Sequence, residues 1–502
     1  MTVRRKLLSD LLRGIIDVPA ESDCEISAVS FDSRTVTPGS LFLARNGIAT
    51  HGLTFVAQAM QRGAAAVLWE TAESITPPQL PEDIFAAALK DFSISAGEIT
   101  AKFFDQPSDT LSVIGVTGTN GKTTVSHLVA QALELNGTGC GVIGTLGTGR
   151  PGKILPGELT TPEVLQLQQQ LVNFMEAACN CVVMEVTSHA LDQGRVSGVH
   201  FHTVVFTNIT RDHLDYHENE GAYAVAKSRL FSTAGLQCAV INAEDPVGQE
   251  FIKLVRNVPM VVGYGIGALD TNSFDGIHIL TAREIDYTEL GLSFTAVFDG
   301  AEARVDVPLI GRFNVYNVLA VIGVLLGQEI PLETAVAVLQ DVKQITGRME
   351  RFGGQSVPVV IVDYAHTPDA LLQSLNAARA HTRGQLFCVF GCGGDRDRGK
   401  RTEMGRIAER LADHVVVTDD NPRTEQASEI VQEILAGMQQ PDHASVIHDR
   451  ASAIKTAIGH AKSDDVVLVA GKGHEEYQIT AAGKKYFSDR DIVTRSLEEW
   501  VA

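Results

Sequence analysis

The stretch Ile114-Gly-Val-Thr-Gly-Thr-Asn-Gly-Lys-Thr-Thr124 decides how the middle of this chain folds. An apolar run over residues 111–116 leads into it, and a helical pattern over residues 125–135 follows it. This order of strand, glycine-rich turn and helix is the context that a phosphate-binding loop requires. Glycines let backbone N–H groups converge on phosphate oxygens, and the helix N-terminus adds partial positive charge. The stretch therefore predicts a site for a nucleoside triphosphate.

The loop departs from the usual pattern at one position. The pattern Gly-x-x-x-x-Gly-Lys requires a glycine where this chain has Val116, which is flanked by Gly115 and Gly118. A glycine-rich turn followed by a chance lysine is the alternative interpretation. The intact order of strand, Gly-Lys-Thr-Thr and helix favours the phosphate-binding loop over that alternative.

The polar side chains of the loop have distinct predicted roles. Lys122 is expected to reach the terminal phosphates, and the hydroxyl of Thr123 or Thr124 to ligate Mg²⁺. The residues predicted to contact the nucleotide here are Gly118, Thr119, Asn120, Gly121, Lys122, Thr123 and Thr124.

Composition limits the class of protein. A chain of 502 residues suggests about three domains, and 44% hydrophobic with 20% charged residues is typical of a soluble protein. The formal charge of −20 argues against nonspecific binding to nucleic acid or to anionic membranes, because both reward Lys and Arg. Seven cysteines without a paired CxxC motif indicate reduced thiols in the cytosol.

The sequence shows neither a secretion signal nor a membrane span. The N-terminus is basic but continues as an amphipathic helix pattern, not as an apolar signal core. The most apolar helical stretch, residues 315–327, is too short to span a bilayer and contains Asn317. We expect a cytoplasmic monomer that acts on small molecules, without membrane insertion or a nucleic-acid partner.

The chain divides into three blocks, and the predicted class is α/β. Residues 1–107 mix short strands and turns, with Pro107 at a natural boundary. Residues 108–345 alternate strands and helices, which favours a parallel sheet covered on both faces, the central P-loop domain. Residues 346–502 repeat strand, Gly/Asp-rich turn and helix, the order of a doubly wound, Rossmann-like domain. The strands expected around the central and C-terminal sites are 181–186, 203–206, 359–362, 385–390, 414–418 and 465–469.

Polar segments follow two central strands. Glu185-Val-Thr-Ser-His-Ala-Leu-Asp-Gln-Gly-Arg195 comes after one strand, and Thr207-Asn-Ile-Thr-Arg-Asp-His-Leu-Asp-Tyr-His217 after the next. Ligands in open α/β sheets bind beyond the carboxyl ends of strands, so both segments should face the phosphate loop. Glu185 and His213 are plausible ligands of Mg²⁺ there, although hard oxygen ligands dominate such sites. A structural role for His213 is the alternative, which its place in a polar strand-end loop disfavours.

Four other polar residues are ambiguous when judged by chemistry alone. Lys227 lies on a helical pattern with Lys and Arg on one side, which is usually a solvated face. Asn314 and Asn317 open another helical pattern, and either could cap it. Asp363 follows a buried strand and could accept a hydrogen bond from a ribose hydroxyl or start a helix.

Loops at the strand ends of the third block suggest recognition of an acid. Residues 391–400 and 418–425 both present Arg beside Asp, and residues 471–478 complete the same rim. A planar guanidinium suits carboxylate recognition, so Arg396 and Arg423 could hold an acidic ligand. Pairing between Arg and Asp within the loops is an equally open alternative.

Taken together, the motifs resemble those of the Mur ligases of bacterial peptidoglycan synthesis. The matching motifs are Gly-Thr-Asn-Gly-Lys-Thr, Glu-Val-Thr-Ser-His, Thr-Asn-Ile-Thr-Arg-Asp-His-Leu-Asp, Gly-Arg-Phe-Asn-Val-Tyr-Asn, Asp-Tyr-Ala-His-Thr-Pro and Gly-Lys-Gly-His-Glu. The resemblance covers nearly the full chain, including Asp32-Ser-Arg34 near its start. It implies an N-terminal domain for a UDP moiety, a central ATPase domain and a C-terminal domain for an incoming amino acid.

The resemblance also implies roles for particular residues. It assigns Ser33, Thr160, Thr161, Thr187, Gln193 and Arg195 to a UDP-muramoyl-dipeptide, and Asn314, Arg348 and Asp363 to the adenine nucleotide. It assigns Thr123, Glu185, His213 and Lys227 to Mg²⁺, with Lys227 carbamylated by CO₂, and makes Lys122, Lys227, His213 and Glu185 catalytic. It assigns Arg396, Asp420, Asn421, Pro422, Arg423, Gly471 and Glu475 to the amino acid.

The loop Asp420-Asn-Pro-Arg423 looks like the family's meso-diaminopimelate signature. Diaminopimelate is lysine with a second carboxylate at its far end, which suits the bidentate guanidinium of Arg423, while Glu475 suits the distal ammonium. The implied reaction joins diaminopimelate to the D-Glu of UDP-N-acetylmuramoyl-L-Ala-D-Glu, with ATP and through an acyl phosphate.

Sequence features disfavour three other functions. A folylpolyglutamate synthase is disfavoured by the Asp-Ser-Arg and Asp-Asn-Pro-Arg loops. A nucleotide-dependent switch would not need an acid-recognising loop in a separate domain. A catalytically inactive binding protein for cell-wall precursors is disfavoured because the phosphate-loop and metal-site residues are all present.

Overall fold

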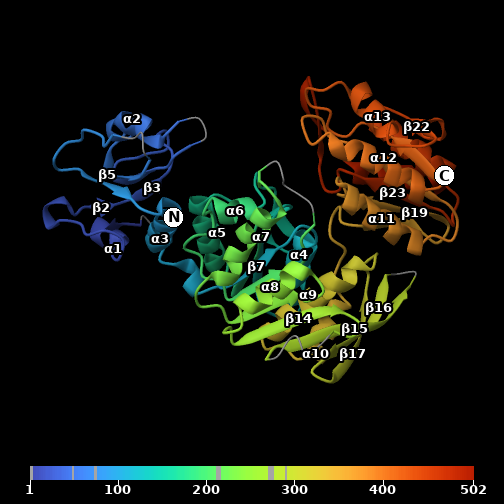
Figure 1. The fold of residues 1–502 in the computed structure, drawn as a ribbon, viewed down its shortest axis with the longest axis horizontal. Helices are drawn as coiled ribbons and strands as arrows, with labels where there is room; N and C mark the ends of the chain where they lie inside the picture. The colour runs from blue at the N-terminus through green and yellow to red at the C-terminus, as the bar shows by residue number, and fades with distance from the viewer. Residues whose placement is uncertain are drawn as a thin grey trace.

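The structure is a computed structural model that describes residues 4–47, 50–72, 76–210, 216–269, 276–288 and 291–501. The described residues form three lobes that follow one another along the chain (Figure 1). The central lobe carries the largest sheet. The N-terminal and C-terminal lobes lie on opposite sides of it in Figure 1. The predicted α/β class with three domains is confirmed, while the domain limits at 107 and 345 stay predictions.

The N-terminal lobe is built on a parallel sheet. Its strand order within the described residues is β3 (Ala28–Ser30), β4 (Ser40–Ala44), β5 (Ala64–Glu70) and β6 (Phe85–Leu89). A smaller antiparallel pair joins β1 (Lys6–Leu7) to β2 (Glu25–Ile26). The helices of this lobe are α1 (Leu8–Leu12), α2 (Val56–Gln61) and α3 (Phe92–Phe103). Apolar side chains of α1 and α3 pack against one face of the sheet, so the strands predicted near residues 28, 40 and 64 form a genuine core.

The central lobe holds a long mixed sheet. In the described part of the chain its order is β10-β9-β8-β11-β7-β12-β13-β14-β15-β16-β17. The strands from β8 to β15 are parallel, and antiparallel strands flank them on both sides. Their bounds are β7 (Ser112–Thr117), β8 (Cys140–Gly144), β9 (Gly147–Arg150), β10 (Lys153–Leu155), β11 (Cys181–Glu185), β12 (Thr203–Phe206), β13 (Cys238–Asn242), β14 (Met260–Ile266), β15 (His278–Tyr287), β16 (Leu292–Phe298) and β17 (Ala301–Val307).

Helices cover both faces of this sheet, as its buried parallel strands require. One apolar cluster joins the sheet to α4 (Lys122–Leu135), α9 (Phe313–Gly327) and α10 (Leu332–Leu339). A second cluster joins the other face to α5 (Val164–Glu176) and α8 (Pro246–Leu254). The remaining helices of the lobe are α6 (Ser188–Asp192) and α7 (Glu220–Ser228). Because β7 lies between β11 and β12, the segments after these three strands meet at one edge, as predicted.

The C-terminal lobe repeats this arrangement on a smaller scale. Its sheet order, among the residues described, is β18-β19-β23-β20-β21-β22, with β19, β23, β20, β21 and β22 parallel. The bounds are β18 (Glu350–Gly354), β19 (Val357–Asp363), β20 (Leu386–Phe390), β21 (His414–Val417), β22 (Ser445–Val446) and β23 (Val466–Ala470). Helices α11 (Pro368–Ala380), α12 (Gly399–Leu411) and α13 (Ala427–Leu435) cover one face, and α14 (Arg450–His460) and α15 (Asp489–Val501) the other. After β23, β24 (Tyr477–Thr480) and β25 (Gly483–Tyr486) form an antiparallel hairpin.

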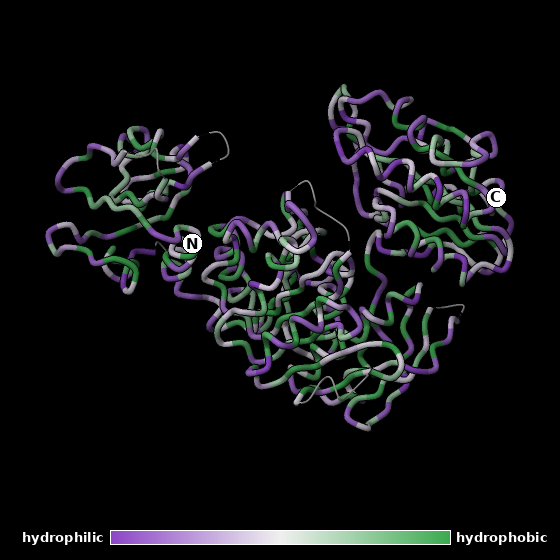
Figure 2. Tube along the Cα trace, viewed as in Figure 1, coloured by the Kyte–Doolittle hydropathy of each residue, from purple (hydrophilic) through white to green (hydrophobic). Residues whose placement is uncertain are grey.

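Hydropathy follows the layers. The strands of the central and C-terminal sheets are hydrophobic in Figure 2, whereas many connecting loops are hydrophilic. Helix α9 is the most apolar helix, and 11 of its residues are buried, so its hydrophobicity serves the core. No helix in the described ranges is long and apolar enough to cross a membrane.

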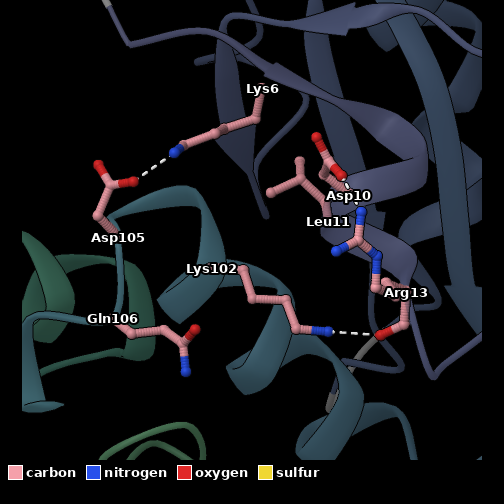
Figure 3. Close-up of a pocket in the computed structure, with 7 residues that line it drawn as sticks. All are labelled: Lys6, Asp10, Leu11, Arg13, Lys102, Asp105 and Gln106. Carbon is pink, nitrogen blue, oxygen red and sulfur yellow. Dashed lines mark hydrogen bonds and ion pairs between the residues drawn. The ribbon is translucent and has the colours of Figure 1, made fainter.

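A surface pocket of about 490 Å³ lies within the N-terminal lobe, between α1 and the end of α3 (Figure 3). Its lining residues are Lys6, Asp10, Leu11, Arg13, Lys102, Asp105 and Gln106. Lys6 pairs with Asp105, and the Lys102 ammonium donates to the Arg13 carbonyl at 2.7 Å. These charges satisfy one another, and none of the residues predicted to bind a substrate lines this pocket.

Candidate active site

The backbone of the loop after β7 depends on its glycines. Gly118 has φ +147°, and a Cβ there would lie 1.9 Å from Thr207 Oγ1. Gly121 has φ +86°, and its Cβ would lie 2.5 Å from Asn317 Oδ1. Both positions therefore exclude a side chain. Val116, where the usual pattern has glycine, is buried within β7, so the variant residue belongs to the strand and not to the turn.

The segment after β12 holds this loop in shape. The Thr119 N–H donates to the Asn208 carbonyl at 2.7 Å, and the Asn120 N–H donates to Asn208 Oδ1 at 3.0 Å. The Thr207 hydroxyl donates to the Asn120 carbonyl at 2.6 Å. Sequence reasoning placed Thr207-Asn208 beside the loop but gave Asn208 no role. An asparagine at a strand end next to a phosphate loop was the signal available.

Two lysines converge on the loop. Lys122 Nζ donates to the carbonyl oxygens of Gly118 and Thr119, each at 2.9 Å. Lys227 Nζ, on α7, donates to the same Gly118 oxygen at 2.9 Å and lies 4.4 Å from the centre of the Tyr223 ring. Lys227 is only 1% exposed, so the alternative of a solvated helix face is wrong.

An oxygen-rich cluster lies at the first turn of α4. The Thr123 hydroxyl donates to Glu185 Oε2 at 3.0 Å, and the Thr145 N–H donates to Glu185 Oε1 at 2.8 Å. Glu185 is fully buried, and a Cβ at Gly144 would lie 2.2 Å from Oε1, so the carboxylate fills the space that this glycine leaves. A hydroxyl beside a carboxylate is the hard-oxygen donor set that Mg²⁺ prefers, so these residues fit that ion. The predicted ligand His213 lies outside the described residues.

The junction of the central and C-terminal lobes reaches this cluster. Arg348 Nη2 donates to the Thr123 hydroxyl at 3.2 Å, and its guanidinium lies 4.5 Å from the Tyr364 ring centre. Tyr364 in turn lies 5.0 Å from the His474 ring. Burial, with the positive Arg348 nearby, lowers the pKa of His127 to about 4 and the pKa of His474 to about 3. Both imidazoles are therefore neutral near pH 7.

Asp363 and Asn314 also lie near this junction. Asp363 does not start a helix and Asn314 does not cap one, the two alternatives that the sequence left open. Asp363 is the last residue of β19, and its carboxylate accepts from the Met349 N–H at 2.8 Å and the Ser374 hydroxyl at 2.7 Å. It does not start α11, which Thr367 caps. The Asn314 amide donates to the Ile310 carbonyl at 2.7 Å and accepts from Asn317. Neither asparagine caps α9, because that helix starts one residue before Asn314.

The residues predicted for the muramoyl dipeptide gather beside Glu185. The Thr161 hydroxyl donates to the Glu185 carbonyl at 2.8 Å, and the Thr187 N–H donates to Thr161 Oγ1 at 3.1 Å. Arg195 Nη1 donates to the Thr161 carbonyl at 3.1 Å, and its Nε to Gln193 Oε1 at 2.9 Å.

Two further predicted residues lie around this group. Thr160 lies 3.1 Å from Thr145, between their hydroxyl oxygens. Ser33 is separate, buried in the N-terminal lobe, where its hydroxyl donates to Gln58 Oε1 at 2.7 Å. An ion pair between Arg45 and Glu163 at 3.2 Å ties that lobe to the central one, and Glu163 also pairs with Arg195 at 3.3 Å.

The loops after β21 and β23 meet in the C-terminal lobe. Asn421 Nδ2 donates to Glu475 Oε2 at 3.0 Å, and a Cβ at Gly471 would lie 2.6 Å from Asp420 Oδ2. Lys472 belongs to the Gly471-Lys-Gly-His-Glu475 motif but was given no role from the sequence, and its Nζ donates to Asn421 Oδ1 at 3.0 Å. Pro422 lies buried in the same loop.

The two predicted acid-binding arginines flank one glycine. A Cβ at Gly393 would lie 2.8 Å from Arg423 Nη1 and 3.9 Å from Arg396 Cγ. Arg423 Nη1 donates to the Gly394 carbonyl at 2.7 Å, and Arg396 is exposed. In the described part of the chain neither guanidinium pairs with a carboxylate, so internal pairing with aspartate does not account for them.

Comparison with known families agrees with this arrangement. The Mur ligase middle domain matches residues 116–325, the "Mur ligase, glutamate ligase domain" matches residues 347–473, and the "Mur ligase family, catalytic domain" matches residues 25–102. Two proteins named UDP-N-acetylmuramoyl-L-alanyl-D-glutamate--2,6-diaminopimelate ligase are each 45% identical to this chain. The one from Pseudomonas aeruginosa aligns over 481 residues, 96% of this chain and 97% of that protein. The one from Xylella fastidiosa aligns over 487 residues, 96% of each. The chain belongs to the Mur ligase family.

Solved structures of related ligases share the fold of this Mur ligase. A structure described as UDP-N-acetylmuramoyl-L-alanyl-D-glutamate--2,6-diaminopimelate ligase has a TM-score of 0.71 and 34% identity, and the alignment covers 95% of this chain and 96% of that one. A Mycobacterium tuberculosis folylpolyglutamate synthase with ADP has a TM-score of 0.62 at 18% identity, covering 76% of this chain and 92% of that one, and shows only the shared fold. The Mur ligase resemblance inferred from the motifs is confirmed.

Proposed function

We propose that this protein is an ATP-dependent, ADP-forming amide ligase that adds meso-diaminopimelate to the D-Glu of UDP-N-acetylmuramoyl-L-Ala-D-Glu, a step in peptidoglycan precursor synthesis. The observation that carries the acceptor assignment is the presence of both charges in one lobe. Arg423 lies two residues after Asn421, and Asn421 Nδ2 donates to Glu475 Oε2 on the neighbouring loop. A guanidinium suits a carboxylate, and a carboxylate suits an ammonium. Full-length relatives named for this reaction support the same assignment.

In the first step the γ-carboxylate of D-Glu attacks the γ-phosphorus of ATP. A P–O bond forms to the carboxylate, the bond to the β–γ bridging oxygen breaks, and an acyl phosphate and ADP result. Such transfer depends mainly on positioning and on neutralising negative charge. Lys122 supplies a cation at the loop, and the backbone N–H groups at the start of α4 supply partial positive charge.

In the second step the amine of diaminopimelate attacks the acyl carbon. The tetrahedral intermediate then expels phosphate, and an amide bond remains. The acceptor loops would hold the distal end of the amino acid, with its carboxylate at Arg423 and Arg396 and its ammonium at Glu475. The amine at the other end of the amino acid would then be free to attack the acyl carbon.

Thr123 and Glu185 would hold Mg²⁺, together with His213 and a carbamylated Lys227. The ion would neutralise charge on the transferring phosphoryl group. As an ammonium, Lys227 cannot ligate a cation, whereas a carbamate formed from CO₂ offers carboxylate-like oxygens. Lys227 is buried at the phosphate loop and shares the Gly118 carbonyl with a second cation, Lys122, and this placement supports the modification.

The remaining predicted residues would bind the adenine nucleotide and the UDP-linked dipeptide. Arg348, Asp363 and Asn314 would bind the adenine nucleotide at the junction of two lobes. Thr160, Thr161, Thr187, Gln193 and Arg195 would hold the dipeptide, and Ser33 the UDP end. These small-molecule substrates point to work in the cytoplasm, and we propose a monomer that uses neither nucleic acid nor membrane insertion.

Two experiments test the reaction. Product formation, ADP and phosphate should appear in equal amounts, and only when all three substrates are present. With ¹⁸O in the D-Glu γ-carboxylate, one ¹⁸O atom should move to the released phosphate, because the attacking oxygen leaves with phosphorus. Phosphate release without an amino acid product would favour the nucleotide switch, and phosphate free of ¹⁸O would contradict the acyl phosphate.

A further inference from the structure

Lys472 is a fully buried lysine in the acceptor region, at 0% exposure. Burial of an ammonium is costly unless good partners surround it. Its Nζ donates to Asn421 Oδ1 at 3.0 Å and to Glu475 Oε2 at 3.1 Å, and lies 3.6 Å from Asp420 Oδ1. One ammonium therefore contacts three polar residues that come from two loops.

Those three contacts tie the loops after β21 and β23 together. Asn421 completes the link, because its Nδ2 donates to Glu475 Oε2 at 3.0 Å and its Oδ1 accepts from the Ile479 N–H at 2.9 Å. Glu475 Oε2 is thus fixed by both Lys472 and Asn421. The buried ammonium is therefore one of the groups that hold this carboxylate in its orientation.

A second buried cation lies on the other side of Asp420. Arg450 makes a bidentate pair with Asp489, with both N···O distances at 2.7 Å. A Cβ at Gly471 would lie 2.6 Å from Asp420 Oδ2 and 3.8 Å from Arg450 Nη2, so the two groups flank the same glycine. The carboxylates of Asp420, Glu475 and Asp489 against the cations Lys472 and Arg450 leave one net negative charge.

We propose that Lys472 is a positioning residue for the acceptor amino acid. Its ammonium orients Glu475 and reduces the charge of the acid cluster to the single negative charge that one substrate ammonium neutralises. This inference rests on the proposed function, because it takes Glu475 as the group that meets the distal ammonium. Lys472 itself touches neither the amino acid nor the reacting atoms.

The orientation and the charge both matter for the choice of ligand. Without Lys472, the buried carboxylate of Asp420 and the half-buried carboxylate of Glu475 would share a site with no cation between them, and their repulsion favours the uptake of a proton by one of them. A protonated Glu475 is a poor partner for an ammonium. Loss of Lys472 should therefore weaken binding of the diamino acid and leave the nucleotide site intact.

The test is steady-state kinetics of Lys472→Met with all three substrates varied in turn. The KM for diaminopimelate should rise by about tenfold or more, because one partner of a buried charge pair is removed. The KM values for ATP and for the UDP-linked substrate should stay within about twofold of wild type. Lys485→Met, which removes an exposed lysine from the neighbouring hairpin, is the matched control and should change none of them.

A double-mutant cycle with Glu475→Gln separates positioning from general support of the lobe. If Lys472 acts through Glu475, adding Lys472→Met to Glu475→Gln should raise the KM for diaminopimelate by less than about threefold. Additive losses would overturn the proposal. If Lys472→Met alone fails to fold, the double variant still decides, because the proposal expects it to fold and to behave like Glu475→Gln.

Adduct formation by the wild-type enzyme separates a failure of the proposed function from a failure of the role given to Lys472. A wild type that makes no diaminopimelate adduct contradicts the proposed function. A wild type that makes it, together with Lys472→Met of unchanged KM for diaminopimelate, contradicts only the role of Lys472.

Discussion

Lys122 and Lys227 donate to the same oxygen, the carbonyl of Gly118, at 2.9 Å each. They come from different helices, α4 and α7, so two ammonium groups are brought together at the phosphate loop. Like charges this close repel one another. Conversion of Lys227 to a carbamate would replace the repulsion with attraction and supply oxygen ligands, while Lys122 kept its charge for the phosphates.

Lys227 should therefore carry CO₂ in the active enzyme. Activity of enzyme freed of bicarbonate should fall and recover when bicarbonate is added, and ¹³C-bicarbonate should give a carbamate signal in the NMR spectrum. Lys227→Met should lose both the signal and the activity. Full activity of Lys227→Met would contradict the role given to this residue.

Lys122→Ala should lower kcat by about 10²-fold or more, because a cation positioned for the transition state is removed. The fold should persist, since Lys122 is only half-buried and its loop is held by Asn208. Single-turnover ATP cleavage and thermal unfolding would measure the two effects. Lys153→Ala, an exposed lysine of β10, is the control, and turnover of Lys122→Ala near that of this control would refute the assignment.

Glu185→Gln should weaken the use of Mg²⁺. The amide keeps a similar shape but loses the charge, so the Mg²⁺ concentration for half-maximal activity should rise by about tenfold or more. A magnesium titration of initial rates would show this, with Glu176→Gln at the exposed end of α5 for comparison. An unchanged Mg²⁺ requirement would mean that Glu185 serves only to hold Thr123 and Thr145.

Arg423→Ala should lower kcat/KM for diaminopimelate by about 10- to 100-fold, the worth of hydrogen bonds to a charged group. The value for L-lysine should change little, because lysine lacks the distal carboxylate. Parallel kinetics with both amino acids would measure the change in preference. Arg410→Ala, exposed on α12, should leave the preference as in wild type, and equal losses for both amino acids would disprove carboxylate recognition by Arg423.

Acid should destabilise the junction of the central and C-terminal lobes. His127 takes up a proton near pH 6.5 in the unfolded chain but only near pH 4 when folded. The unfolded state therefore binds more protons between these values, and stability falls as pH drops from about 6.5 to about 4, by on the order of 3 kcal/mol for this residue. Burial affects His474 in the same direction.

Thermal unfolding midpoints at pH 7 and pH 5 would test this. The drop between them should be smaller in His127→Gln, which has no titrating ring. An equal drop in both proteins would show that His127 does not contribute.

Much of the fold could be predicted from sequence because it depends on local patterns. The apolar runs near residues 111, 181 and 203 became β7, β11 and β12, and their polar ends met as parallel strands require. Side-chain partners could not be predicted in this way. The burial of Lys472 depends on a loop 51 residues away, and the contact of Arg348 with Thr123 spans 225 residues.

Short-range rules also failed in places. Asn314 has a residue type that caps helices, yet it lies inside the first turn of α9 because the helix starts at Phe313. Lys227 has a pattern typical of a solvated face, yet α7 turns it toward the phosphate loop. In both cases tertiary packing decided the outcome, which one chain segment does not reveal.

The most direct test of the whole account is ATP-dependent ligation of UDP-N-acetylmuramoyl-L-Ala-D-Glu with meso-diaminopimelate and with L-lysine in parallel, read by mass spectrometry. The account predicts a diaminopimelate adduct and little lysine product. Strong lysine product would contradict the role of Arg423 in recognising the distal carboxylate. Steady ATP hydrolysis without an adduct of either amino acid would contradict the ligase itself.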